Sequence, residues 1–210
     1  MDFRRPLSVV APTLDGDVLG VLAGADEEFT GRRIHQVLGR GSEQGVRKAA
    51  DRLVGQGIVS RRQAGQAKLY SLNRNHLAAP YIEGLGSLRA LLIERLKELT
   101  GGWEEPAAAV FLFGSVARGD ADAGSDLDLF VLRRPVTVKD DTLWQEQLAE
   151  LEREATVWTG NEARVLEFRD RDFADPEVRK IGREVVRSGV AIVGSRLRIS
   201  KLLQKYKGPT

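Results

Sequence analysis

The chain has 210 residues, with 32 Lys and Arg against 30 Asp and Glu, 22 Gly and no Cys. This length suits one large domain or two small ones. The lack of cysteine excludes disulfide scaffolds, thiolate metal sites and a cysteine nucleophile. No apolar run approaches the roughly 20 residues of a membrane span, and the N-terminus has no signal-peptide core. The composition therefore predicts a soluble, cytoplasmic protein with no membrane partner.

The near-neutral total charge conceals an uneven distribution along the chain. Residues 1–100 hold 15 basic and 11 acidic side chains, whereas residues 101–210 hold 17 and 19. The segment Arg32–Arg74 alone has ten basic residues against Glu43 and Asp51, a net charge of +8. A basic block within a periodic, folded-looking segment predicts a polyanionic partner.

The first third of the chain has the pattern of three short helices followed by a hairpin. Apolar residues in 14–22 recur at helical spacing. Thr30 is the expected N-cap of a second helix that ends at Gly39, and Ser42 is the expected N-cap of a third, over residues 43–56. Two alternating runs, 58–62 and 67–72, then flank a glycine-containing turn and predict a β-hairpin.

This order of elements, over about residues 14–74, resembles the winged helix-turn-helix family of DNA-binding regulators. The resemblance implies that the third helix enters the major groove of double-stranded DNA and that the hairpin touches phosphate. The implied DNA-binding residues are Ser42, Gln44, Arg47 and Lys48 on the helix, and Arg61, Arg62 and Lys68 on the hairpin. The alternative is a protein-interaction module whose basic residues are merely solvated.

A leucine-rich stripe connects this region to the second half of the chain. Apolar residues from Leu77 to Leu99 are spaced by three or four positions, which predicts one amphipathic helix, weakened at its start by Pro80, Gly84 and Gly86. Two interpretations stay open. The helix forms a homodimer, as a palindromic DNA site would require, or it is a linker that packs on its own domains.

Two aspartates stand out in the second half of the chain. An apolar strand at 107–113 leads into Gly114 and Ser115, and a second strand at 125–132 carries Asp126 and Asp128. Alternation places both carboxylates on one face of that strand. Two such charges on an apolar strand need a compensating cation, and oxygen ligands suit Mg²⁺ that also contacts substrate phosphates. Backbone N–H groups at the Gly-Ser turn suit phosphate oxygens.

The remaining pattern predicts a small α/β unit around these strands. We expect a helix over 143–155, a third strand over 161–168, a helix beginning at Pro176, a short strand at 190–193 and a final amphipathic helix.

The string Gly114-Ser115, ten residues, then Asp126-Leu127-Asp128-Leu129 resembles the nucleotidyltransferase superfamily of the DNA polymerase β type, and especially its minimal bacterial and archaeal members. The resemblance implies that Asp126 and Asp128 bind two Mg²⁺ ions. A third carboxylate, for which Glu167 is the candidate, would complete the metal site or act as base. Gly114, Ser115 and Arg118 would bind the triphosphate of an NTP, with ATP as the favoured donor.

The sequence thus predicts an α+β protein with three parts: a winged helix-turn-helix domain at 1–75, a linker or dimerisation helix at 76–102, and a nucleotidyltransferase domain with a mixed sheet at 103–210. The predicted function is metal-dependent transfer of a nucleoside monophosphate, AMP for preference, to an acceptor hydroxyl. An antitoxin-like modifier of a partner protein that autoregulates its operon is the first interpretation. Adenylylation of a small molecule such as an antibiotic, or a regulator that binds nucleotide without turnover, are the alternatives.

Overall fold

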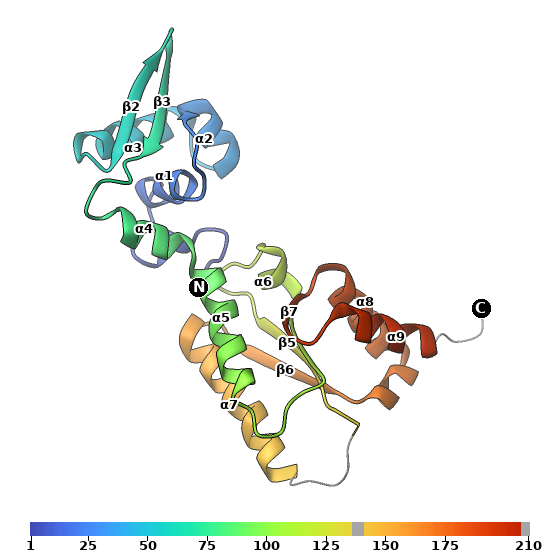
Figure 1. Cartoon of the computed structure of the whole chain (residues 1–210). Helices are drawn as coiled ribbons and strands as arrows, with labels where there is room; N and C mark the ends of the chain where they lie inside the picture. The colour runs from blue at the N-terminus through green and yellow to red at the C-terminus, as the bar shows by residue number, and fades with distance from the viewer. Residues whose placement is uncertain (136–140, 207–210) are drawn as a thin grey trace. The chain divides into compact units, whose positions relative to one another are not determined.

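The computed structural model of the protein describes residues 1–135 and 141–206 (Figure 1). The chain divides into two compact units near residue 88. The N-terminal unit holds Asp2 and Arg4–Leu88, and the C-terminal unit holds Arg89 onward together with Met1 and Phe3. Each unit is described by itself below.

The N-terminal unit combines helices with a three-stranded antiparallel sheet of order β1-β3-β2. The hairpin β2–β3 pairs in continuous register from Val59 opposite Leu72 to Ala64 opposite Ala67. The elements are η1 (Pro6–Val9), α1 (Leu14–Ala23), β1 (Phe29–Thr30), α2 (Gly31–Leu38), α3 (Glu43–Gly55), β2 (Val59–Ala64), β3 (Ala67–Leu72) and α4 (Ala79–Gly86).

The helix boundaries in this unit follow from local capping. The hydroxyl of Thr30 accepts a hydrogen bond from the Arg33 N–H, and that of Ser42 from the Gly45 N–H, as their N-cap positions predict. Gly39 ends α2 at φ 62°, a left-handed conformation that glycine adopts without steric cost. The apolar faces of α1, α2 and α3 then bury Leu22, Ile34, Val46, Ala49 and Leu53 in one cluster with the sheet.

The connector is not the single helix that the leucine stripe predicts. It forms α4 (Ala79–Gly86) and α5 (Leu88–Gly101), which are separated at Ser87. The Gly84 and Gly86 backbone is intrinsically poor in helix propensity, which explains the interruption. Leu92 and Leu96 of α5 are buried in the core of the C-terminal unit, whereas Tyr81 of α4 is 76% exposed.

The C-terminal unit is built on a four-stranded mixed sheet of order β6-β5-β4-β7. Strand β5 pairs parallel with β6, and β4 pairs antiparallel with both β5 and β7. The elements that follow α5 are β4 (Ala109–Phe113), α6 (Gly114–Arg118), β5 (Leu127–Leu132), α7 (Asp141–Thr159), β6 (Ala163–Phe168), η2 (Asp170–Ala174), α8 (Pro176–Ser188), β7 (Val190–Val193) and α9 (Arg196–Lys205).

Helices cover both faces of this sheet (Figure 1). Leu127 and Leu129 of β5 point to the face that α5 and α7 cover, where they pack in a cluster with Leu96 and Trp144. Phe130 points to the opposite face, in a cluster with residues of α8 and α9. The predicted alternation along β5 is therefore confirmed, and so are the predicted α+β class and mixed sheet.

Among the helices that the structure describes, none has both the length and the apolar composition needed to cross a membrane.

Candidate functional site

The turn between β4 and α6 brings Gly114 against the second aspartate of the motif. Phe113 at the end of β4 pairs with Asp128 of β5, so the next residue of the chain lies beside the Asp128 side chain. Gly114 has φ 71°, and a Cβ added there would lie 2.5 Å from Asp128 Oδ2. Both the backbone conformation and the space thus require glycine at this position.

Asp126 and Asp128 form a carboxylate pair at the start of β5. Asp126 immediately precedes the strand, and Asp128 is its second residue, half-buried within an otherwise buried strand. Burial raises the pKa of the Asp128 carboxyl above its ordinary value, and the negative charge of Asp126 raises that pKa further. Arg164, Glu184 and Arg118 make smaller contributions to that pKa, and the two arginines act to lower it.

Arg164 of β6 is the nearest counter-ion of the pair. It lies directly opposite Asp128 in the parallel register, and its Nη1 is 2.8 Å from Asp126 Oδ2. Its Nε also lies 3.8 Å from Glu162 Oε1. The sequence does not indicate Arg164, because the alignment of β6 against β5 cannot be derived from either strand alone.

Arg118, the predicted triphosphate cation, already has acidic partners. Its Nη1 lies 2.7 Å from Glu184 Oε1 on α8, and its Nε lies 3.5 Å from Asp120 Oδ2. Glu184, which is also close enough to influence the pKa of Asp128, is a second residue that no pattern in the sequence indicates. The site therefore combines the Asp126–Asp128 pair with two guanidinium groups and with the further acidic partners of those guanidinium groups.

Glu167 does not join this cluster. Glu167 lies opposite Val131, which faces α7, and Trp144 Nε1 of that helix donates a 2.9 Å hydrogen bond to Glu167 Oε1. Three residues of strand, roughly 10 Å, also separate its register position from that of Asp128. The predicted carboxylate triad is thus wrong for Glu167, because the parallel register places it on the opposite face of the sheet. Among the described residues, no group of three or more His, Asp or Glu side chains is placed to hold a metal.

The remaining carboxylate pair fits one divalent cation. Mg²⁺ in phosphoryl-transfer sites is commonly held by one or two carboxylates together with water and substrate phosphates. Burial, and after it the negative charge of Asp126, disfavour the ionised form of Asp128 and raise its pKa, and the two arginines offset this only in part. A bound cation would offset it. Asp126 and Asp128 are the residues that would hold this ion.

Asn161 holds the loop that leads into the Asp126–Asp128 carboxylate pair. Its side chain is buried, and its Nδ2 donates hydrogen bonds to the carbonyls of Asp122, at 3.3 Å, and Ser125, at 2.8 Å. Because Ser125 directly precedes Asp126, these bonds determine where the chain enters β5. No pattern in the sequence indicated this role.

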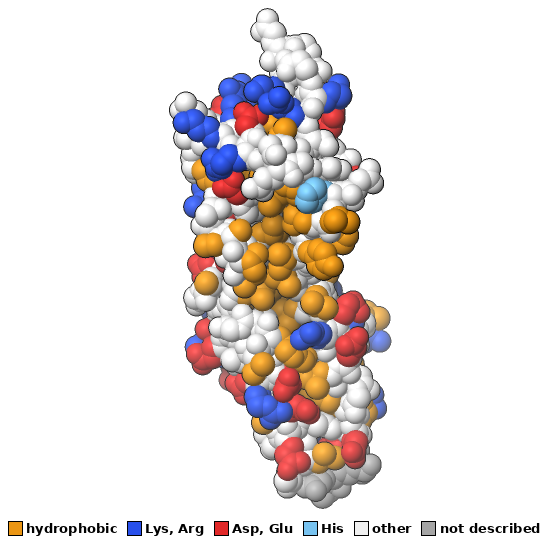
Figure 2. Space-filling model, turned by 90° about the vertical axis from the view of Figure 1, so that its left-hand side faces the viewer, with side chains coloured by type: hydrophobic (Ala, Val, Ile, Leu, Met, Phe, Trp, Pro, Cys, Tyr) orange, Lys and Arg blue, Asp and Glu red, His pale blue; other side chains and the backbone are white. Residues whose placement is uncertain are grey.

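The predicted DNA-binding residues lie on the exposed surfaces of α3 and the β2–β3 hairpin, but several have acidic partners. Arg47 pairs with Glu43, Arg62 with Glu28, and both Arg61 and Lys68 pair with Asp51, at 3.2 and 3.6 Å. The Ser42 hydroxyl is used as a cap. Figure 2 accordingly shows acidic side chains among the basic ones.

Chain segments from outside Arg32–Arg74 supply some of these acids. Glu28 pairs with Arg62. Asp15 pairs with Arg52 at a distance of 2.7 Å. The net charge of +8 counted along that segment therefore overstates the local charge in the folded unit, because folding brings acids from before it to its surface.

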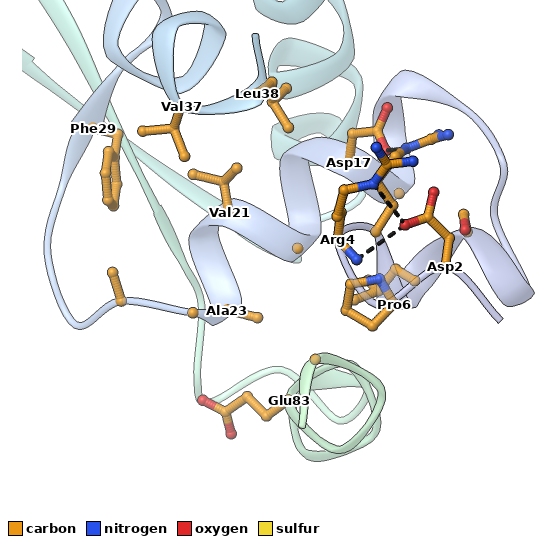
Figure 3. Close-up of a pocket in the computed structure, with 18 of the residues that line it drawn as sticks. Asp2, Arg4, Pro6, Asp17, Val21, Ala23, Phe29, Val37, Leu38 and Glu83 are labelled. Carbon is orange, nitrogen blue, oxygen red and sulfur yellow. Dashed lines mark hydrogen bonds and ion pairs between the residues drawn. The ribbon is translucent and has the colours of Figure 1, made fainter. Parts of the chain in front are cut away.

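A separate pocket of about 1120 Å³ is lined by residues of the N-terminal unit (Figure 3). At its edge Asp17 of α1 is buried, with Arg5 Nε 2.7 Å from Oδ1 and Arg40 Nη1 3.2 Å from Oδ2. This ion triad links α1 to the segment before it and to the turn between α2 and α3. The pocket lining includes none of the motif residues of the C-terminal unit.

Comparison with known families agrees with the geometry of the C-terminal unit. Residues 90–181 match the family model described as the nucleotidyltransferase domain. The matched segment, a little less than half of the chain, includes Gly114, Asp126, Asp128 and Arg164. No curated protein matched the chain.

Several solved structures are similar to about half of the chain. A toxin–antitoxin complex with AMP-PNP has 18% identity and a TM-score of 0.39, covering 54% of this chain and 82% of that chain. A complex of a tri-AMPylated Shewanella oneidensis HEPN toxin with its MNT antitoxin has 16% identity and a TM-score of 0.37, covering 56% and 82%. The MntA–HepT toxin–antitoxin complex has 16% identity and a TM-score of 0.36, with the same coverage. Such low similarity does not transfer a function.

Proposed function

We propose that the protein is a metal-dependent nucleotidyltransferase that moves a nucleoside monophosphate from an NTP, ATP for preference, to an acceptor hydroxyl. The observation that carries this proposal is the contact between the Gly114 turn and Asp128, beside Asp126. It places a glycine turn, which has no side chain to fill the space, and two carboxylates at one end of the sheet.

The roles of the residues follow from their positions. Asp126 and Asp128 hold Mg²⁺, which when bound supplies positive charge to the phosphates of the donor. The Gly114–Ser115 backbone and the Ser115 hydroxyl bind phosphate oxygens, and Arg118 adds a positive charge near them. To contact the triphosphate, Arg118 has to give up part of its ion pair with Glu184. Opening of the Arg118–Glu184 ion pair is therefore a step in donor binding.

The acceptor is proposed to be a partner protein. The motif resembles that of minimal nucleotidyltransferases, which implies an antitoxin-like modifier. AMP transfer to a protein side chain is therefore the first acceptor reaction to test.

The activity is tested with the purified full-length chain, Mg²⁺, labelled ATP and the proteins that co-purify with it. We expect release of pyrophosphate, and a mass increase of one nucleotide on one co-purifying protein. Asp126→Asn and Asp128→Asn should each lower the rate at least roughly 100-fold, because each removes a charged metal ligand.

Glu167→Gln is the matched control, since this carboxylate lies on the opposite face of the sheet. Its rate should stay within about threefold of the wild-type rate if the variant remains folded. Equal losses in all three variants would contradict the proposed site.

A nucleotide-binding regulator without turnover is the second candidate. The observation that favours it is that, among the described residues, no group of three or more His, Asp or Glu side chains is placed to hold a metal. ATP that binds the wild-type chain with no product on any acceptor would support this candidate instead.

We further propose that the N-terminal unit is a winged helix that binds double-stranded DNA. The support is its element order, with a β-hairpin directly after α3, and the exposed basic residues on both. Residues 1–75 would form this domain, with 76–102 as connector and 103–210 as the catalytic domain. A homodimer that reads a palindromic site, and autoregulation, belong to the same proposal.

The DNA proposal is tested by titrating a short duplex at several salt concentrations. Replacing both Arg47 and Lys48 with Ala should weaken binding and reduce the salt slope by about 2, because each lost phosphate contact contributes about 0.9. Replacing Arg153 and Lys180 of the C-terminal unit is the matched control. An unchanged slope in the Arg47 and Lys48 variant would contradict a role of α3 in DNA binding.

A further inference from the structure

Arg164 stands where a cation is needed in the carboxylate site. In the parallel pairing of β5 with β6, it is the residue directly opposite Asp128, and its Nη1 lies 2.8 Å from Asp126 Oδ2. Three positions farther along β6, Glu167 bonds to Trp144 on the other face of the sheet. The charged side chain that β6 brings to Asp126 and Asp128 is therefore a cationic guanidinium and not a carboxylate.

The charges of the cluster show what this arginine does. Arg118 is paired with Glu184 at 2.7 Å and with Asp120 at 3.5 Å. Arg164, which also lies 3.8 Å from Glu162, is the cation paired directly with Asp126. Without Arg164 the carboxylate pair would present −2 to a divalent cation. Because attraction scales with the product of the charges, the guanidinium lowers the affinity of the pair for metal.

The ion pair is placed so that it can open. The Arg164 side chain is 53% exposed and that of Asp126 is 34% exposed, so neither group is held in the core. Exposed pairs of this kind contribute little to stability. The guanidinium can move into solvent or toward phosphate without disturbing the sheet, and Asp126 then becomes available as a metal ligand.

We propose that Arg164 is an internal counter-ion that competes with the divalent metal for Asp126, so that metal binding requires the Asp126–Arg164 ion pair to open. This inference rests on the proposed function, because it assigns the metal to Asp126 and Asp128. In this proposal the protein without nucleotide binds a divalent cation weakly, because Arg164 occupies the cation position beside Asp126. The ion pair opens when the metal binds, alone or together with a nucleotide.

The test measures Mn²⁺ binding to the full-length chain without nucleotide, by the loss of the free-Mn²⁺ electron paramagnetic resonance signal. Arg164→Gln should bind Mn²⁺ roughly three- to tenfold more tightly than the wild-type chain. Arg164→Met should show the same gain. Arg164→Lys retains the positive charge and should stay within about twofold of wild type.

Arg171→Gln is the matched control. It removes an exposed arginine of the same unit that pairs with Asp172, and its Mn²⁺ affinity should equal that of the wild-type chain. Unchanged or weaker binding in both neutral Arg164 variants would overturn the inference and would mean that the ion pair is only structural.

The failure of the inference and that of the proposed function give different results. If wild-type and Arg164 variants bind Mn²⁺ equally and Asp128→Asn abolishes binding, only the counter-ion role is wrong. If no variant binds Mn²⁺, both the counter-ion role and the metal-dependent function are overturned. A melting curve for each variant identifies any that is unfolded, and the second neutral variant then decides.

Discussion

At the scale of single residues, Gly114 and Asp128 depend on each other. The left-handed backbone of Gly114 turns the chain from β4 into α6, and the missing side chain leaves room for Oδ2 of Asp128. A second left-handed glycine, Gly119, ends the same short helix with no atom within 4 Å of an added Cβ. Both positions have a left-handed backbone, but only at Gly114 would an added Cβ meet another atom. The effects of substituting the two glycines can therefore be compared directly.

We expect Gly114→Ala to abolish Mn²⁺ and ATP binding and Gly119→Ala to preserve both. Each substitution costs about 1–2 kcal/mol for a left-handed alanine, and Gly114→Ala adds a clash with a carboxylate, for roughly 1–3 kcal/mol more. Denaturant unfolding measures the stability difference and titration measures binding. Equal effects of the two variants on binding would contradict a specific role for the Gly114–Asp128 contact.

At the scale of elements, Asp51 joins α3 to the hairpin. Its carboxylate accepts hydrogen bonds from Tyr70 of β3, at 3.1 Å, and Arg61 of β2, at 3.2 Å. Lys68 Nζ lies 3.6 Å away. Burial acts to raise the pKa of Asp51, but these hydrogen bonds and charges outweigh burial and leave the pKa below its ordinary value.

The depressed pKa gives a signed pH dependence. A group with a lower pKa in the folded state adds stability above its unfolded pKa of about 3.9 and loses it as the pH falls through the folded value. Asp51→Asn should therefore cost about 0.5–1 kcal/mol at pH 7, a modest figure because the carboxylate is 40% exposed. The difference from wild type should shrink below about pH 4.

Urea unfolding between pH 3 and pH 7 measures this difference. Asp26→Asn is the matched control, since its side chain is 91% exposed and pairs only at the surface with Arg74. It should change stability by at most a few tenths of a kcal/mol. A cost for Asp51→Asn that is the same at pH 3 and pH 7 would contradict the pairing.

At the scale of the whole molecule, the two units have separate cores. The apolar cluster around Leu22 draws only on residues of the N-terminal unit, and the two clusters on either face of the four-stranded sheet draw only on the C-terminal unit. Stability in such a chain is expected to be partitioned between units.

We expect core truncations to destabilise one unit at a time. Leu22→Ala and Leu129→Ala remove fully buried side chains, and each should cost about 2–5 kcal/mol in its own unit. Hydrogen exchange read by mass spectrometry should then show lost protection from α1 through β3 in the first variant and in β4–β6 in the second. Each variant is the control for the other, and loss of protection across both units would contradict independent cores.

The local elements were predictable because their signals are local. Caps at Thr30 and Ser42, the end of α2 at Gly39 and the alternation in β5 depend on residues within a few positions of one another. The connector was predicted less well, since the stripe of leucines continues through Ser87 although the helix does not. There the apolar spacing hid the weak helix propensity of Gly84 and Gly86.

The motif can be read from the chain without a structure: a glycine turn, two aspartates ten residues later and the strand that carries them. Which charges meet the two aspartates depends on the fold. The register of β6 against β5 brings Arg164, rather than Glu167, to the aspartates, and folding places Glu28 and Asp15 beside basic residues that looked unopposed along the chain. Spacing along a strand fixes alternation, but register and ion pairing arise between segments distant in sequence, and they depend on the packing of the whole unit.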